Sequence, residues 1–216
     1  MKDHNTNKNR KKKVCNTRER IMENARELFF SYGLKSISMD ELAKQSGISK
    51  KTIYRCFEDK DVLVHAVVVD LIQLHERLHL AYQTIANDAI DEAIELGNDL
   101  FGIWADIRPG FYYETKKFFP NAWLELEEYS LKMRTIIINN LEKGKKEGLY
   151  RNNIKPGLVA DVRLHQLIDF LQSRSLTSEK LTTDQLIKEL TILYLQSIVT
   201  EKGRNILDYY LKNERL

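Results

Sequence analysis

The chain has 216 residues, of which 43% are hydrophobic and 30% charged, so it can bury a core and form one or two domains. It contains no segment of about 18 or more apolar residues, which excludes a membrane-spanning helix. The net charge of +3 hides an asymmetry, because residues 1–60 hold 15 basic and 8 acidic side chains, whereas the remainder holds 19 and 23. A basic segment joined to an acidic body is typical of a nucleic-acid-binding module attached to a second domain.

The fold class and the compartment follow from the same composition. Long amphipathic periods recur without alternating segments, and only three prolines and nine glycines are present, so we predict an all-α protein. The isolated Cys15 and Cys56 argue against a disulfide framework and a cysteine-ligated zinc site. The basic N-terminus lacks the apolar stretch of a signal peptide. These features favour a cytoplasmic protein.

The N-terminal residues divide into a tail and a helix. Residues 1–16 are polar and basic, and we predict a disordered arm that either adds phosphate contacts or is merely solvated. Thr17 is suited to cap a helix that ends at Gly33. Its buried face is predicted from apolar residues at spacings of three and four, namely Ile21, Ala25, Leu28 and Phe29.

The next segment predicts two short helices joined by a tight turn. Ser38 and Glu41 have the spacing of a reciprocal capping box, so a helix is expected from Met39 to about Ser46. Gly47 stands where the chain must turn, because glycine adopts positive φ without a steric penalty. A second helix follows after Ser49 as far as about Phe57, with Ile53 and Phe57 facing inward. This arrangement is a helix-turn-helix.

The outer side of the second helix is a candidate DNA-contacting surface. Two lysines in its first turn are locally unfavourable beside the helix dipole, unless that end of the helix meets an anion such as a DNA phosphate. The competing interpretation is that the lysines are merely solvated, because any small helical protein can contain two short capped helices. We expect Thr52 and Lys51 to approach base edges and most of the others to contact phosphates, the full set being Ser38, Ser49, Lys50, Lys51, Thr52, Tyr54, Arg55 and Lys60.

The segment TRERIMENARELFFSYGLKSISMDELAKQSGISKKTIYRCFEDKDVL resembles the DNA-binding domain of the TetR (tetracycline-repressor-like) family of bacterial regulators. It departs from the family pattern at Cys56, where an aromatic residue or histidine is usual. The resemblance implies a C-terminal helical bundle that dimerises and binds a small effector, and most members of the family are repressors. We therefore predict an N-terminal helix-turn-helix DNA-binding domain over residues 17–63 and a ligand-binding and dimerisation domain over residues 64–216.

A long helix is predicted from Asp59, as its cap, to about Ala86, and it contains the metal-binding pattern H-E-x-x-H. On a helix, His75 and His79 would share one face for zinc and Glu76 would act as a general base. A zinc metallohydrolase is therefore the alternative function. No third ligand is fixed by spacing, although Glu95 is one option. We instead expect solvated helix residues, no metal, no cofactor and no enzymatic activity.

Two further helices are predicted over residues 88–107 and 110–119, bounded by Pro109 and Pro120. Eight of the twenty aromatic residues lie between positions 101 and 123. Such crowding either lines an effector pocket or forms ordinary core. The effector would be apolar or aromatic, and cationic if Glu114 and Asp106 contribute. The predicted pocket residues are Phe101, Trp104, Tyr112, Tyr113, Phe118 and Trp123.

The C-terminal part predicts a helix over residues 121–148, a helix from Pro156 to about Arg174, a third over residues 184–199 and a terminal helix over 203–216. The second and third of these are apolar on more than one face, so each needs two partners. They either form a four-helix interface with a second subunit or are both central helices. The expected protein is a homodimeric, effector-responsive repressor that binds a palindromic operator. The third alternative is a purely structural interaction protein, which would show no salt-dependent affinity for DNA.

Overall fold

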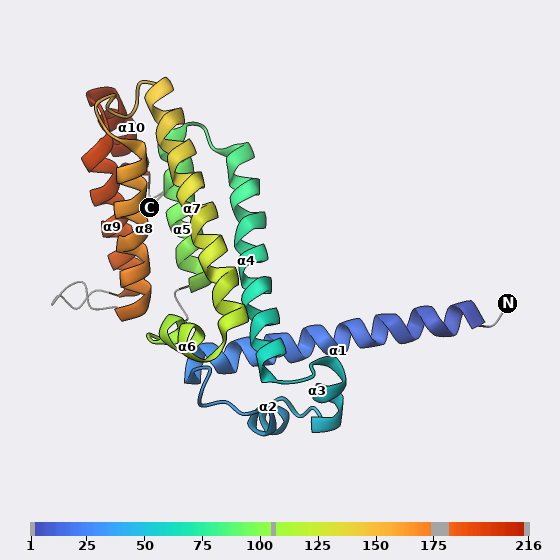
Figure 1. Ribbon diagram of the computed structural model, residues 1–216. Coiled ribbons are helices and arrows are strands. Elements are labelled where there is room, and N and C mark those ends of the chain that lie inside the picture. The colour runs from blue at the N-terminus through green and yellow to red at the C-terminus, as the bar shows by residue number, and fades with distance from the viewer. Residues whose placement is uncertain (1–2, 105–106, 174–181, 214–216) are drawn as a thin grey trace. The chain divides into compact units, whose positions relative to one another are not determined.

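The computed structural model describes the backbone of residues 3–104, 107–173 and 182–213, and the side chains of 17–98, 107–169, 182 and 185–213. Within these ranges the chain forms ten α-helices and no strand (Figure 1), which confirms the all-α class. Their bounds are α1 Asp3–Tyr32, α2 Met39–Ser46, α3 Lys50–Cys56, α4 Lys60–Ile85, α5 Ala89–Trp104, α6 Phe111–Phe118, α7 Pro120–Lys146, α8 Pro156–Ser173, α9 Thr183–Ile198 and α10 Glu201–Lys212.

The chain divides into two compact units. Unit 1 comprises Met1–Asp70 and Gly110–Glu125, and unit 2 comprises Leu71–Pro109 and Leu126–Leu216. The helices α4 and α7 each begin in unit 1 and end in unit 2. The units follow packing, so unit 1 includes residues 110–125, which the sequence analysis assigns by function to the C-terminal domain.

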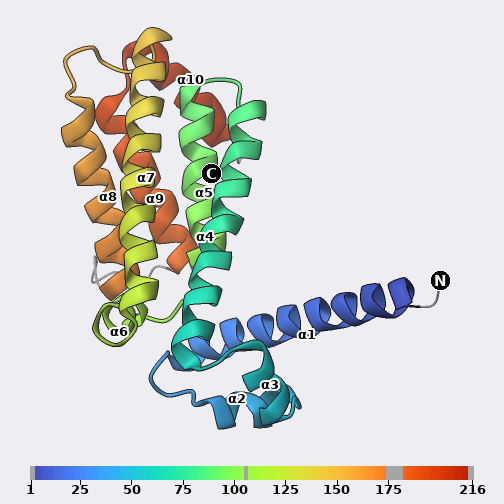
Figure 2. The ribbon, with the colours of Figure 1, turned by 45° about the vertical axis from the view of Figure 1, so that its right-hand side comes forward.

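Unit 1 is built on α1, against which α2 and α3 pack. The buried side of α1 carries Ile21, Ala25 and Phe29, each at most 1% exposed, as the sequence spacing predicts, whereas Leu28 of the same predicted face is half-buried. The expected disordered arm and the expected cap at Thr17 are both corrected, because α1 begins at Asp3 and Thr17 lies inside it. This N-terminal part of α1 extends well past α2 and α3 in both views (Figures 1 and 2). Residues 3–16 contain no glycine or proline that would interrupt the helix, and five of them are lysine or arginine, which are good helix formers, alongside four asparagines, which are weaker ones.

Unit 2 places α5 against α9 and α10. Two buried side chains bind the start of α5. The side-chain amide of Asn140 and the hydroxyl of Tyr150 both donate to the Ala89 carbonyl, at 2.9 and 2.8 Å. The Tyr150 ring packs so closely on Gly144 that a Cβ at this position would lie 2.1 Å from a ring carbon. None of the described helices has the length and apolarity needed to cross a membrane.

Candidate functional site

Two serine caps shape the helix-turn-helix. The Ser38 hydroxyl accepts a hydrogen bond from the Glu41 amide at 3.1 Å, and the Ser49 hydroxyl accepts from the Thr52 amide at 3.2 Å. Gly47 adopts φ of 63° between the two helices, as its position predicts. The second bond of the expected capping box, from the Ser38 backbone N–H to the Glu41 carboxylate, is replaced by another. The Glu41 carboxylate instead accepts a hydrogen bond from the side-chain amide of Gln45 at 2.7 Å.

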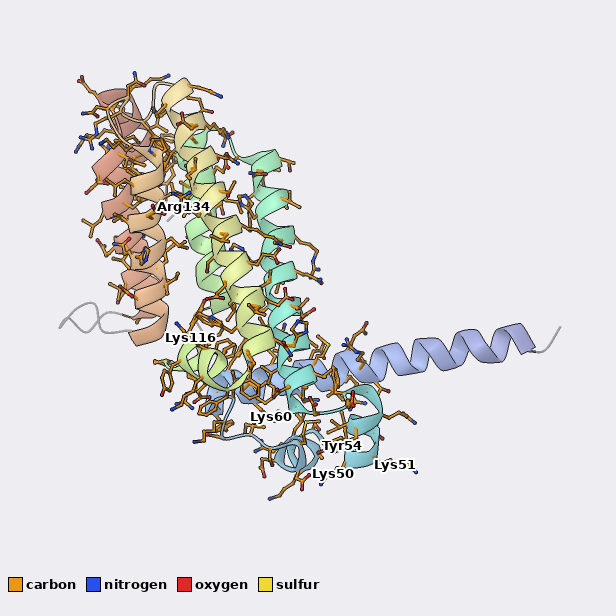
Figure 3. The ribbon with its side chains drawn as sticks, in the orientation of Figure 1. Lys50, Lys51, Tyr54, Lys60, Lys116 and Arg134 are labelled. Atoms are coloured by element: carbon orange, nitrogen blue, oxygen red, sulfur yellow. The ribbon has the colours of Figure 1, made fainter. Side chains whose placement is uncertain are left out.

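The short helix α3 separates a buried side from a polar side. Ile53 is fully buried and the following Phe57 is 1% exposed. On the other side, Lys50, Lys51, Tyr54 and Arg55 are exposed and Thr52 is half-buried. Figure 3 shows Lys50, Lys51 and Tyr54 on α3. The predicted DNA-contacting residues of α3 therefore lie on the part of the helix that packing leaves accessible.

One of these lysines, Lys50, already has an acidic partner within unit 1. The Lys50 ammonium lies 2.6 Å from a carboxylate oxygen of Asp40 on α2, and this hydrogen bond raises the pKa of Lys50. The same ammonium is 5.9 Å from the centre of the Tyr54 ring. A phosphate approaching Lys50 must compete with Asp40, a residue that the sequence analysis did not single out.

Lys60 and Thr52 have internal partners as well. The Lys60 ammonium is 6.0 and 5.6 Å from the ring centres of Phe29 and Phe119, and burial lowers its pKa. Its ammonium is thus directed at the aromatic rings of its own unit, so a phosphate contact would require another rotamer. The Thr52 hydroxyl lies 2.8 Å from the Ser49 hydroxyl, with which it shares a hydrogen bond.

The H-E-x-x-H pattern lies on α4 in unit 2, where its two histidines are buried and not solvated as the sequence analysis expects. His75 is 0% exposed and bonds through Nδ1 to the Tyr129 hydroxyl, while His79 is 5% exposed. Burial lowers the pKa of His75 to about 4 and also lowers that of His79. Glu76 instead lies 3.2 Å from the Lys132 ammonium.

This geometry gives the metallohydrolase alternative no support. The buried Nε2 atoms of the two histidines have no hydrogen-bond partner among the described residues. Within the described side chains, no three His, Cys, Asp or Glu residues come together as a metal site. The carboxylate that would serve as a general base, that of Glu76, is paired with the Lys132 ammonium.

The predicted aromatic pocket is divided between the two units. Phe101 and Trp104 belong to α5 in unit 2, and their side chains lie outside the described residues. The other four belong to unit 1. Tyr113 is 62% and Phe118 38% exposed, so neither is enclosed. Tyr112 and Trp123 are half-buried, and burial raises the pKa of Tyr112.

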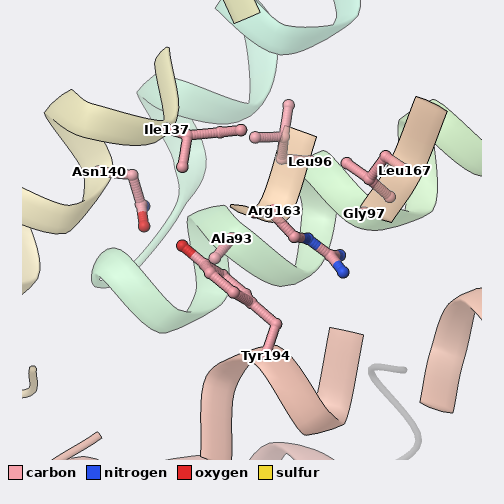
Figure 4. Close-up of a pocket in the computed structure, with 8 residues that line it drawn as sticks. All are labelled: Ala93, Leu96, Gly97, Ile137, Asn140, Arg163, Leu167 and Tyr194. Atoms are coloured by element: carbon pink, nitrogen blue, oxygen red, sulfur yellow. The ribbon is translucent and has the colours of Figure 1, made fainter. Parts of the chain in front are cut away.

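A cavity in unit 2 has a different lining. It holds about 20 Å³, which is room for about one water molecule. Figure 4 shows its residues, which come from α5, α7, α8 and α9: Ala93, Leu96, Gly97, Ile137, Asn140, Arg163, Leu167 and Tyr194. No motif in the sequence points to this set of residues. The available signal was Arg163, a charged residue within the apolar stretch of α8.

Three comparisons with known proteins bear on the family. Residues 21–67 match the model of the bacterial regulatory proteins of the tetR family. HTH-type transcriptional regulators of several Staphylococcus aureus strains are 28% identical to the chain, with 58% of this chain and 77% of theirs covered.

Solved structures agree in fold. A putative transcriptional regulator from Saccharomonospora viridis in complex with choline aligns with a TM-score of 0.73 and 16% identity, covering 87% of this chain and 100% of that one. A TetR-family regulator from Agrobacterium tumefaciens gives the same values. The matched segment contains the serine-capped helices described above, so residues 21–67 form a domain of the tetR family of bacterial regulatory proteins.

Proposed function

We propose that this regulator is a repressor that binds a palindromic operator as a homodimer in the cytoplasm and releases it when a small effector binds in unit 2. The observation that carries the proposal is the exposed side of α3, where Lys50 and Lys51 follow the serine cap in the first turn and Tyr54 and Arg55 continue the same surface into the last turn. Amides at a helix N-terminus together with flanking cations favour phosphate. Such a helix fits the major groove of DNA.

The proposal gives each residue of the predicted interface a role. Lys51 and Arg55 have no acidic partner within the described part of the chain, so they are available for DNA without breaking an ion pair. Lys51 and Thr52 contact base edges in the proposed complex, while Ser38, Ser49, Lys50, Tyr54 and, after a rotamer change, Lys60 contact the backbone. Arg55 adds a cation at the end of the same surface.

A homodimer is supported by apolar side chains that the single chain leaves uncovered. On α8, Leu158 and Val162 are 61% and 63% exposed and lie four residues apart, and on α9 Leu193 is 57% exposed. Residues four apart share one face of a helix. The inner sides of the same helices bury Leu167, Ile187 and Leu190. A second copy can cover the outer faces, forming a four-helix interface.

Effector binding can reach the DNA-contacting unit through continuous helices. The helix α4 begins at Lys60 in unit 1 and ends at Ile85 in unit 2. A symmetric dimer must hold its two α3 helices about one DNA turn, ~34 Å, apart. A shift of α4 that changes this spacing needs a coupling of only about 1–3 kcal/mol to lower operator affinity about 5- to 150-fold.

The test is selection of bound sequences from random DNA with purified protein, followed by affinity measurements across salt concentrations. The expected result is an enriched inverted repeat bound by two chains, with affinity that falls as salt rises. Recovery of no enriched sequence, together with affinity that does not depend on salt, would overturn the proposal. Transcription from a promoter carrying the selected site distinguishes a repressor from an activator.

A further inference from the structure

The side chain of Arg163 is a buried cation with neutral neighbours. It is 4% exposed. One terminal nitrogen donates to the Gln166 side chain at 2.8 Å and to the Leu190 carbonyl at 3.1 Å, and the other donates to the Thr191 hydroxyl at 2.9 Å. The guanidinium carbon lies 4.8 Å from the centre of the Tyr194 ring. None of these neighbours carries a negative charge.

Such an environment is energetically unfavourable for a charge. Burial lowers the pKa of Arg163 to about 10, opposed only by Tyr194 among the described side chains. A buried cation without a counter-ion has lost its hydration without gaining the attraction of an anion. Three of the five guanidinium N–H groups donate in the bonds above, and the described residues supply no acceptor for the other two. The side chain therefore has both charge and donors to offer a ligand.

The same guanidinium lines the small cavity of unit 2. Around it, the cavity wall is formed by the apolar side chains of Ala93, Leu96, Ile137 and Leu167. In Figure 4, the Tyr194 hydroxyl and the Asn140 amide lie on the side away from the end of the guanidinium. An apolar wall with one cation matches a ligand that has an aliphatic body and one anionic group.

We propose that the effector is an aliphatic carboxylate whose anionic group binds Arg163. This inference rests on the proposed effector-responsive function and specifies its ligand. The carboxylate supplies the missing negative charge. Because the cavity holds only about 20 Å³, the proposal requires wall residues such as Leu96 and Leu167 to move apart when an aliphatic chain enters. The sign of the charge is opposite to the cationic option drawn from Glu114 and Asp106. Glu114 is engaged in unit 1, where it accepts from the Lys35 amide at 3.0 Å.

The test measures binding of straight-chain carboxylates from acetate to dodecanoate to the full chain without DNA, by calorimetry and thermal shift. The amide of each chain length is the matched neutral probe. The variants are Arg163→Met, which removes the charge, and Arg163→Lys, which keeps it without the forked geometry. Arg134→Met is the matched control, because Arg134 is an arginine of unit 2 that pairs with Asp161 on the surface.

We expect at least one carboxylate of the series to bind the wild-type chain and Arg134→Met equally, and its amide to bind at least 10-fold more weakly. Loss of a charge-assisted hydrogen bond predicts affinity about 10- to 100-fold lower for Arg163→Met. Arg163→Lys should be intermediate, and it keeps the test decisive if the methionine variant does not fold. The failure of every carboxylate, equal binding of the amides, or unchanged binding by both Arg163 variants would each overturn the proposal. DNA binding by the same preparation without carboxylate tests the proposed function separately.

Discussion

The ion pair between Lys50 and Asp40 offers the sharpest test of the DNA interface. Each α3 presents one Lys50, so a dimer loses two phosphate contacts in Lys50→Ala. Each lost contact should flatten the dependence of log affinity on log salt by about 0.9, or about 1.8 for the dimer. Between 50 and 200 mM salt, the wild-type chain should therefore lose about 12-fold more affinity than the variant.

The Asp40→Asn variant should act in the opposite direction. The Asp40 carboxylate accepts from Lys50 at 2.6 Å, so in the free protein it competes with the phosphate for the ammonium. An exposed ion pair of this kind corresponds to a factor of about 1.5 to 5 in an equilibrium constant. With two copies in the proposed dimer, Asp40→Asn should tighten operator binding by about 2- to 25-fold at low salt.

Both variants can be measured by fluorescence anisotropy with the selected operator at four or more salt concentrations. Lys132→Ala is the control, because Lys132 is an exposed lysine of unit 2 that pairs with Glu76 and Glu128. It makes the same change in net charge and should leave the salt slope unaltered. Equal slopes for Lys50→Ala and wild type, or weaker binding by Asp40→Asn, would refute the assignment of Lys50 to phosphate.

Three further predictions concern single positions. Thr52→Ala should change which bases are preferred more than it changes affinity for non-specific DNA, as measured by repeating the sequence selection; an unchanged motif would remove Thr52 from the base contacts. Leu193→Glu, which places a charge on the exposed apolar face of α9, should yield monomers or insoluble protein in sedimentation experiments; a soluble dimer of wild-type strength would place the interface elsewhere. His75 has a folded-state pKa of about 4, below its ordinary value near 6.5, so the unfolded chain binds the proton first as pH falls. Stability should decrease from pH 6.5 to 4 by on the order of 3 kcal/mol from this group, and His75→Leu should flatten that part of the profile in urea unfolding.

The helix-turn-helix could be predicted from the sequence because its determinants are local. Ser38 and Ser49 each bond an amide three residues ahead, and Gly47 needs only its own backbone freedom to end α2. The apolar spacing that buries Ile53 and Phe57 is also contained within one short helix. The bounds of α2 and α3 therefore follow closely from residues that the chain presents in order. The helicity of residues 3–16 is local too, but the prediction there gave polarity more weight than helix propensity.

Only the tertiary structure decided the environments of the charged and polar side chains. His75 is buried because Tyr129, 54 residues away, supplies its partner, and the spacing of H-E-x-x-H carries no information about that neighbour. Arg163 acquires its neutral surroundings from Leu190 and Thr191 on α9, the latter 28 residues away. Likewise, Lys60 meets the Phe119 ring through the packing of unit 1. Periodicity defines which face of a helix is apolar, but the partner of that face, and so the charge and pKa of each buried group, depends on contacts between segments distant in the chain.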